Sequence, residues 1–151
     1  MDEEPLVQPM RLEDIPRVIE IERQCFPSSW QPGAYQAEVN SSTSHYLVAR
    51  LRGLAVGFTG AWLIGEEAHI TTLAVDPGFQ QRGIGTRLLR ALIDHAMVNG
   101  VNRISLEVRE QNLPARRLYS RSGFQEVAYL RGYYRDTGDD AVVMWLKIDR
   151  V

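Results

Sequence analysis

The 151-residue sequence contains a single cysteine, Cys25, and only three histidines. One cysteine excludes a disulfide framework and a thiolate metal cluster. His45, His69 and His95 are spaced too widely for the metal-binding patterns HxxxH and HExxH, so we expect no metal site. The longest apolar stretches run to about ten residues, which is too short for a membrane-spanning helix.

The chain also lacks an excess of positive charge, since 17 basic and 19 acidic residues give a net charge of −2. Proteins that bind nucleic acid by releasing counterions normally carry a basic excess. The opening residues, Met-Asp-Glu-Glu-Pro, do not resemble the basic start of an export signal. We therefore expect a cytoplasmic protein that binds neither nucleic acid nor membranes, and a monomer is the default.

The periodicity of apolar residues predicts one mixed α/β domain over residues 1–151, with about seven strands and about four helices. The expected strands are 6–10, 45–51, 54–64, 68–75, 103–108, 125–134 and 141–148. The expected helices are 12–25, 32–39, 112–122 and one from 84 to the Asn99-Gly100 stop. This order is typical of a mixed sheet with helices on its faces.

A glycine-rich loop over residues 76–86 joins a strand to the longest helix. Ile84 stands where a P-loop needs lysine, and Leu88 occupies the third glycine position of a dinucleotide fingerprint. The remaining pattern is Gln80-x-x-Gly83-x-Gly85. Because backbone N–H groups and the helix dipole favour anions there, the loop predicts diphosphate binding. The simpler alternative is a strand-to-helix turn.

Glu107 is out of place in its strand, Ile104-Ser-Leu-Glu-Val108. The apolar residues alternate, so Glu107 points away from them, near the strand end where ligands of open α/β sheets gather. This position favours a functional carboxylate. The alternative is a structural ion pair with Arg103 or Arg109.

Two motifs about thirty residues apart resemble the GCN5-related N-acetyltransferase (GNAT) family. The first is Leu73-Ala-Val-Asp-Pro followed by Gln80-x-x-Gly83-x-Gly85, and the second is Asn112-x-x-Ala115-x-x-Leu118-Tyr119-x-x-x-Gly123-Phe124. The expected order of elements is similar to the family's fold from end to end. Within the family, the chain is most similar to the bacterial ribosomal-protein-alanine N-acetyltransferases of the RimI type.

The resemblance implies acetyl-CoA as co-substrate and no metal. The backbone of Leu73, Ala74 and Val75 would pair with the pantetheine arm, and Asn112 would bond that arm. The diphosphate would be held by the loop residues Gln81, Arg82, Gly83, Ile84, Gly85 and Thr86, and Gln80 would be a further cofactor-binding residue. The sequence departs from the family pattern at Leu113-Pro114, where small residues are common, but proline is tolerated in the first turn of a helix.

Acetylation of an amine needs a base for the nitrogen proton and an acid for the departing thiolate. The resemblance implies that Glu107 is the base, directly or through a water, and that Tyr119 is the acid. The simpler alternative for Tyr119 is a core aromatic beside Leu118 and Phe124.

The resemblance also places three aromatic residues, Trp30, Tyr133 and Tyr134, beside the acceptor opening as candidate peptide-wall residues. Each tyrosine could instead pack in the core. Neighbouring strand residues point to opposite faces, so we expect at most one of Tyr133 and Tyr134 to line a given wall.

The expected acceptor is the α-amino group of a protein N-terminus, because its pKa is about 7.7–8.0 against about 10.4 for lysine. Deprotonating lysine costs about 3.5 kcal/mol more, at about 1.36 kcal/mol per pKa unit. The resemblance implies the N-terminal alanine of a small-subunit ribosomal protein. The alternatives are an enzyme for lysine or a small-molecule amine, and a coenzyme A-sensing module without turnover.

Overall fold

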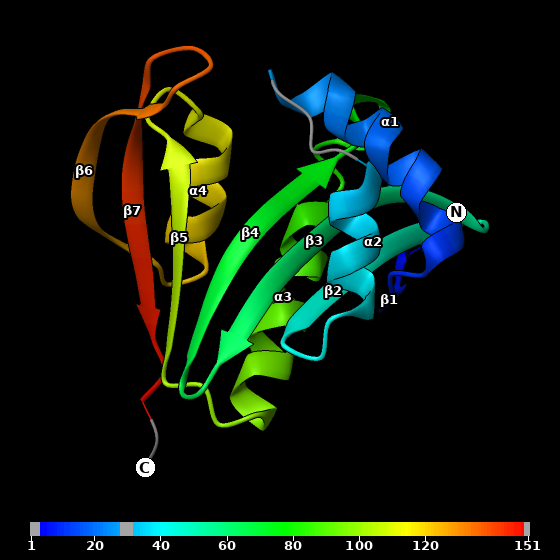
Figure 1. Ribbon diagram of the computed structural model, residues 1–151, viewed down its shortest axis with the longest axis horizontal. Coiled ribbons are helices and arrows are strands. Elements are labelled where there is room, and N and C mark those ends of the chain that lie inside the picture. The colour runs from blue at the N-terminus through cyan, green and yellow to red at the C-terminus, as the bar shows by residue number, and fades with distance from the viewer. Residues whose placement is uncertain (1–3, 28–31, 150–151) are drawn as a thin grey trace.

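The computed structural model describes residues 4–27 and 32–149, and within them one sheet and four α-helices (Figure 1). The strands are β1 (Leu6–Pro9), β2 (Ser44–Leu51), β3 (Leu54–Ile64), β4 (Glu67–Val75), β5 (Arg103–Arg109), β6 (Gln125–Tyr134) and β7 (Asp139–Lys147). The helices are α1 (Ile15–Cys25), α2 (Pro32–Asn40), α3 (Ile84–Val98) and α4 (Leu113–Arg121). The mixed α/β fold expected from the sequence is confirmed.

The sheet divides between β4 and β5. Its strand order is β1-β2-β3-β4-β5-β7-β6, and β4 with β5 is the parallel pair among the described strands. That pairing covers only Glu67 to His69 against Arg103 to Ser105, whereas β5 and β7 pair along the whole of β5. Beyond His69 the two strands diverge, as Figure 1 shows, and the sheet opens toward their carboxyl ends.

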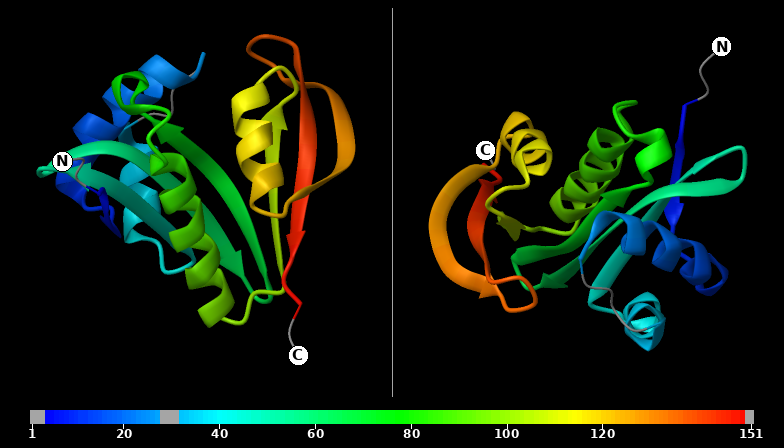
Figure 2. Two further views of the ribbon diagram at one scale, coloured as in Figure 1. Left: turned by 180° about the vertical axis from the view of Figure 1, so that it is seen from behind. Right: turned by 90° about the horizontal axis from the view of Figure 1, so that it is seen from above.

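Two helices cover each face of the sheet (Figure 2). On the face of α3 and α4, a large core includes Leu88 and Leu106, both completely buried. On the face of α1 and α2, a second core includes the completely buried Ile21, Tyr35 and Phe58. No helix in the described part of the chain is long and apolar enough to cross a membrane.

One extra residue in β4, Thr71, bends this strand where it borders the split. Gly60 of β3 pairs with Thr72 and Ala61 pairs with Ile70, so Thr71 has no partner in the register. The Thr71 hydroxyl lies 2.6 Å from the Tyr46 hydroxyl. Because any Cβ at position 60 would overlap the Tyr46 ring, only glycine fits there.

The first helix begins later than the sequence pattern predicts. Leu12–Asp14 form a 3-10 turn, and α1 starts at Ile15. Pro16 has no N–H to donate, and its ring crowds the carbonyl of Leu12, so a regular α-helix cannot begin earlier. The Asp14 carboxylate accepts a hydrogen bond from Arg11 N at 2.8 Å and closes this turn.

Candidate active site

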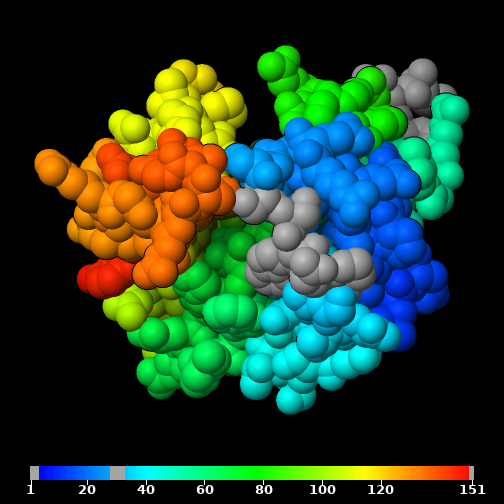
Figure 3. Space-filling view, turned by 45° about the horizontal axis from the view of Figure 1, so that its top comes forward, coloured from blue at the N-terminus to red at the C-terminus, as the bar shows by residue number. Residues whose placement is uncertain are grey.

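A cavity of about 410 Å³ lies at the split of the sheet. Its walls come from the end of α1, from β4 and β5, from α4 and its N-cap, and from the hairpin between β6 and β7. Figure 3 shows this hairpin, in orange, beside the blue end of α1 with the green strands deeper between them. The cavity therefore joins segments that are about a hundred residues apart in the chain.

Glu107 lies in the wall of this cavity and is half-buried. Its Oε2 is 2.9 Å from His69 Nε2, and its Oε1 accepts a hydrogen bond from Tyr133 at 3.4 Å. The hydrogen bond with His69 is the main reason that the pKa of Glu107 lies below its usual range, and it outweighs the effect of burial. The carboxylate is thus kept ionised, as a proton acceptor must be.

The expected alternative of an ion pair between Glu107 and an arginine is wrong. Arg109 pairs with Asp136 and Asp139, each at 3.0 Å. Arg103 pairs with Glu67 at the start of β4. The partner of Glu107 is a histidine, which removes the simplest structural explanation for this carboxylate.

Tyr119 reaches the same cavity from the opposite face of the sheet. It belongs to the core under α3 and α4, and its ring packs edge-on against Phe124 at 5.6 Å between centroids. Burial raises the pKa of its phenol far above the usual value. The phenol therefore keeps its proton at any working pH, as a general acid must. Tyr119 thus packs against Phe124 in the core and also lines the cavity wall.

The glycine loop has the backbone shape of an anion site. Gln81 and Gly83 both have positive φ angles, of 64° and 80°. A left-handed Gly83 precedes α3, whose first N–H groups have no acceptor within the helix. Gly83 has open space around it, whereas a Cβ on Gly85 would come within 3.3 Å of Leu118. Gly83 thus leaves room for a ligand, and Gly85 lets α3 approach α4 closely.

The remaining loop side chains are mostly exposed, and Arg82 lies over the Phe79 ring at 5.3 Å. Gln80 is exposed too, and its Nε2 donates to the Val75 carbonyl at 3.0 Å. Ile84 is buried in the core under α3, and Thr86 is exposed. Ile84 can therefore offer a ligand only its backbone.

The inner edge of β4 is available to a ligand. Leu73, Ala74 and Val75 pair with β3 on one side, and no strand in the described part of the chain pairs with their other edge. The Val75 carbonyl is already used, because it accepts from Gln80 and from Cys25 Sγ at 3.3 Å.

Asn112 also lines the cavity and begins α4. Its Oδ1 accepts a hydrogen bond from Ala115 N at 3.2 Å and so caps the helix. This cap uses neither the Nδ2 group of Asn112 nor the second lone pair of its Oδ1.

The expectation that at most one of Tyr133 and Tyr134 lines the cavity is wrong, because both do. The register of β6 against β7 shifts between Leu130 and Tyr134, and Gly132 has a φ of +60°. This bulge breaks the alternation of side chains. The two rings meet edge-on at 5.1 Å, and the Arg109 guanidinium lies over Tyr134 at 3.9 Å. Trp30 lies outside the described residues.

Two functional candidates were not predicted. His69 contacts Glu107, and the parallel register that places it there leaves no signal in the sequence. Glu22 is 3% exposed in the cavity wall and accepts a hydrogen bond from Tyr35. Glu22 follows Val18 by four residues and Ile19 by three, so helical spacing does place this carboxylate on the buried face of α1.

Comparison with known proteins identifies the family. Residues 15–124 match the sequence model of the Acetyltransferase (GNAT) family. The chain belongs to this family. The matched residues include the glycine loop, Glu107 and Tyr119, but not the hairpin residues 133–136 that also line the cavity.

Three relatives sharpen the comparison. The N-alpha-acetyltransferase RimI of Mycobacterium tuberculosis is 43% identical over 137 residues, which cover 87% of this chain and 85% of that protein. The crystal structure of the ribosomal-protein-S18-alanine N-acetyltransferase from Escherichia coli has a TM-score of 0.89 at 29% identity and covers 97% of this chain and 96% of that one. Arabidopsis thaliana NAA60 in complex with acetyl-CoA shares the fold, with a TM-score of 0.84 at 23% identity and coverage of 95% and 98%. The chain is an acetyltransferase of this family.

Proposed function

We propose that this family member transfers the acetyl group of acetyl-CoA to the α-amino group of a protein N-terminus. The natural acceptor is the N-terminal alanine of a small-subunit ribosomal protein, and the reaction takes place in the cytoplasm. The names of the Mycobacterium and E. coli relatives support this acceptor. The observation that carries the proposal is one cavity in which the pKa of Glu107 is lowered and that of Tyr119 is raised.

The residues around the cavity fit acetyl-CoA. Gly83 has free space in front of it at the start of α3, where a diphosphate gains from the helix dipole. The free edge of Leu73–Val75 runs from this loop toward the cavity, and suits the amide groups of a pantetheine arm. No group of three or more metal-ligating side chains occurs among the described residues. Acetyl-CoA supplies the reactive thioester.

Glu107 and Tyr119 divide the proton transfers. Glu107 accepts a proton from the acceptor nitrogen as that nitrogen attacks the acetyl carbon, directly or through one water. Tyr119 donates its phenolic proton to the sulfur as the carbon–sulfur bond breaks.

An α-amino group suits this site better than a lysine. The site offers a carboxylate with a lowered pKa, which is a weak base. A weak base can deprotonate an amine of pKa about 7.7–8.0 far more readily than one of about 10.4. Tyr133 and Tyr134 add aromatic surface beside Glu107, against which a peptide backbone can lie.

The test compares two peptides that differ only in which amine is free. The first begins with a free alanine and contains no lysine. The second has a blocked N-terminus and one lysine. Incubation with acetyl-CoA is followed by thiol release and by mass spectrometry of the peptide. We expect thiol release and an added acetyl group with the first peptide, and neither with the second.

Each alternative function predicts a different result. Acetylation of the lysine peptide alone would replace the proposal by a lysine acetyltransferase. Turnover of small amines without either peptide would indicate a small-molecule enzyme. Thermal stabilisation by acetyl-CoA, with no thiol release on any acceptor, would indicate a coenzyme A-sensing module.

A further inference from the structure

A row of four side chains crosses the sheet beside Glu107, and we call it the tryptophan row. In the register of the sheet each member pairs with the next: Trp62 of β3, His69 of β4, Ser105 of β5 and Trp145 of β7. Residues directly opposite each other in neighbouring strands lie on the same face of a sheet. Glu107 follows Ser105 by two residues in β5, so it lies on this face as well.

In the described part of the chain, no helix covers this face over β7. This strand lies between β5 and β6, and on its α4 side Val142 and Met144 are 3% and 0% exposed. On its other side, Val143 and Trp145 are only partly buried. Figures 1 and 2 show the reason, because α4 lies behind β5 and β7 whereas α1 and α2 lie over the first strands of the sheet. An apolar part of the sheet is thus open to solvent.

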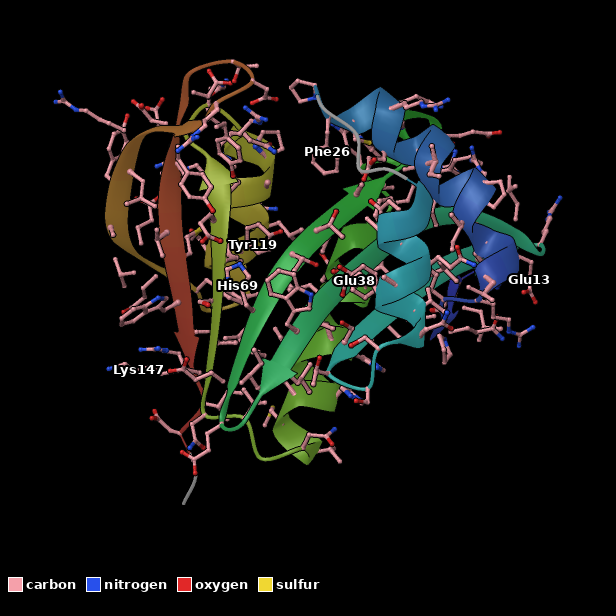
Figure 4. All side chains as sticks on the ribbon, viewed as in Figure 1. Glu13, Phe26, Glu38, His69, Tyr119 and Lys147 are labelled. Carbon is pink, nitrogen blue, oxygen red and sulfur yellow. The ribbon has the colours of Figure 1, made fainter. Side chains whose placement is uncertain are left out.

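The α2 side of the row is apolar and exposed. Trp62 is 38% exposed, and Ile64, two residues further along β3, is 69% exposed. The indole N–H of Trp62 donates to the Glu38 carboxylate of α2 at 2.8 Å, so this acidic group is already bound. In Figure 4, His69 lies between Glu38 on α2 and Lys147 at the end of β7. A partner on this side gains mainly from apolar contact.

The β7 side of the row has the same character. The Arg103 guanidinium lies over the Trp145 ring at 4.2 Å and also pairs with Glu67 of β4. Lys147, opposite Arg103 in the register, is exposed. Since Arg103 and Glu67 neutralise each other, a partner here gains from contact with the indole ring more than from charge. Figure 3 shows the green strands of this surface between the orange hairpin and the cyan α2.

The row lies where the third residue of an acceptor chain would reach. Ser105 is two residues from Glu107, or about 6.6 Å along β5, and an extended chain advances equally far in two residues. A chain whose first nitrogen is at Glu107 and which follows β5 toward Arg103 therefore brings its third residue over the row. Trp62 and Trp145 are three strand spacings apart, about 14 Å, which leaves room for an extended chain between them.

We propose that the tryptophan row is the docking surface for the acceptor segment that follows the acetylated residue. The segment lies extended over His69 and Ser105, and an apolar side chain at its third or fourth position packs against Trp62 or Trp145. The surface is continuous with the cavity through Glu107, and its apolar character matches this occupant. Tryptophans are among the side chains that contribute most to binding at protein interfaces. This inference rests on the proposed function, because it needs a protein chain attached to the acceptor nitrogen.

The first test compares three acceptors that all begin Ala-Gly. One is the dipeptide amide, which ends before the row. The other two are octapeptides with either Leu-Phe or Ser-Gly at their third and fourth positions. We expect kcat/KM to be about ten-fold higher with the Leu-Phe octapeptide than with the Ser-Gly octapeptide, mainly through KM. The Ser-Gly octapeptide should stay close to the dipeptide.

Variants of the row should remove this preference. Trp62→Ala and Trp145→Ala should each reduce the ten-fold ratio between the octapeptides to about three-fold, and the double variant should abolish it. The ratio is the readout, because it cancels any general loss of activity or of folded protein. Trp62→Phe keeps an aromatic ring and should retain most of the preference.

The matched control is Tyr129→Ala. It removes an exposed aromatic side chain from the opposite face of β6, where Tyr129 pairs with Val142. The ten-fold ratio should persist in this variant. Equal kcat/KM with both octapeptides in the wild-type protein would overturn the docking surface, and so would an unchanged ratio in the double variant.

A second test observes the row without turnover. Fluorine NMR of protein labelled with 5-fluorotryptophan gives separate signals for Trp62 and Trp145, which the two alanine variants assign. With coenzyme A present, the Leu-Phe octapeptide should shift both signals and the dipeptide neither. Unchanged signals with the octapeptide would contradict the inference. A dimer in sedimentation that Trp145→Ala dissociates would assign the face to a second copy of the chain and also overturn it.

The dipeptide separates this inference from the proposed function. If the dipeptide is acetylated and neither octapeptide is better, the docking surface is wrong while the proposed function stands. If no alanine peptide of either length is acetylated, the proposed function fails and the inference falls with it.

Discussion

The two faces of the sheet meet the cavity with opposite chemistry. On the face of α1 and α2, Glu107 contacts His69 and Tyr133, and these polar contacts lower its pKa. On the face of α3 and α4, Tyr119 packs among apolar side chains, and burial raises its pKa. Figure 2 shows β4 and β5 diverging, with α1 and α2 on one side of the sheet and α3 and α4 on the other.

This difference fits the proposed roles of Glu107 as base and Tyr119 as acid in one cavity. A carboxylate stays ionised where its hydrogen bonds favour the charge, and a phenol stays protonated where no solvent stabilises the phenolate. The sheet provides the separation, because alternate residues of β5 serve different faces: Leu106 and Val108 pack near Tyr119, and Glu107 does not. Four predictions follow this comparison.

The largest effect is expected on the polar face. Glu107→Gln keeps the size and hydrogen-bonding ability of the side chain but removes the proposed base. We expect kcat/KM for the alanine peptide to fall by about 10²–10³-fold at pH 7. Glu126→Gln, which changes an exposed carboxylate paired with Arg116, is the control and keeps full activity. Full activity of Glu107→Gln in the thiol-release assay would show that Glu107 is not the base.

A smaller effect is expected on the apolar face. Tyr119→Phe removes the proposed acid, but the thiolate of a thiol with a pKa of about 8.5 leaves readily without help. We expect kcat to fall about ten-fold with little change in KM, and the melting temperature to stay close to that of the wild type. Tyr129→Phe, on the exposed side of β6, is the control. A fall in melting temperature without a fall in kcat would make Tyr119 a core residue only.

The bulge in β4 bends the strand that borders the split between the two halves of the sheet. Gly60→Ala tests how much this bulge contributes to stability. The new methyl group would overlap the Tyr46 ring, whose hydroxyl contacts Thr71 in the bulge. We expect a loss of about 1–3 kcal/mol in the free energy of unfolding, measured by urea denaturation. Gly33→Ala, in α2 with open space around it, should raise stability by about 0.5–1 kcal/mol. Equal stability of both variants would show that the bulge tolerates change.

The smallest effect concerns the pH dependence of stability, which must not be confused with that of catalysis. Burial lowers the pKa of His45 to about 4, and it also lowers the pKa of the neighbouring His95. Between pH 6.5 and 4 the unfolded chain therefore binds more protons at these histidines than the folded chain does. Their contribution to the free energy of unfolding is complete above pH 6.5 and is lost as the pH falls toward 4.

Denaturation midpoints from pH 8 to 4 should stay level down to about pH 6.5 and then decline. His45→Phe, which cannot be protonated, should flatten the decline. A midpoint that already falls between pH 8 and 7 would contradict this assignment. Activity changes above pH 6.5 then report the cavity rather than unfolding.

Local patterns predicted the elements well because each one is encoded nearby. The apolar period of α3 and the alternation in β5 depend on neighbouring residues, and both appear where expected. The placement of Glu107 away from Leu106 followed from the same alternation. The glycine loop was also readable, since Gly83 and Gly85 mark it in the chain.

Contacts between distant strands were not predictable in the same way. His69 meets Glu107 only because three residues of β4 pair in parallel with three of β5, and no residue type encodes that register. The error at Tyr133 and Tyr134 had a visible cause, since Gly132 stands inside a strand pattern, where an isolated glycine indicates a bulge.

The central claim is that the proposed base and acid reach one cavity from opposite faces of the sheet. Its most direct test is a crystal structure with a bisubstrate analogue, in which coenzyme A is linked to the α-nitrogen of an alanine peptide. We predict that the peptide enters on the Glu107 face, with its nitrogen reached by the carboxylate directly or through one water. The sulfur should lie within about 3.5 Å of the Tyr119 hydroxyl. A sulfur beside Glu107, or a peptide that enters past Tyr119, would contradict the assignment of base and acid to the two faces.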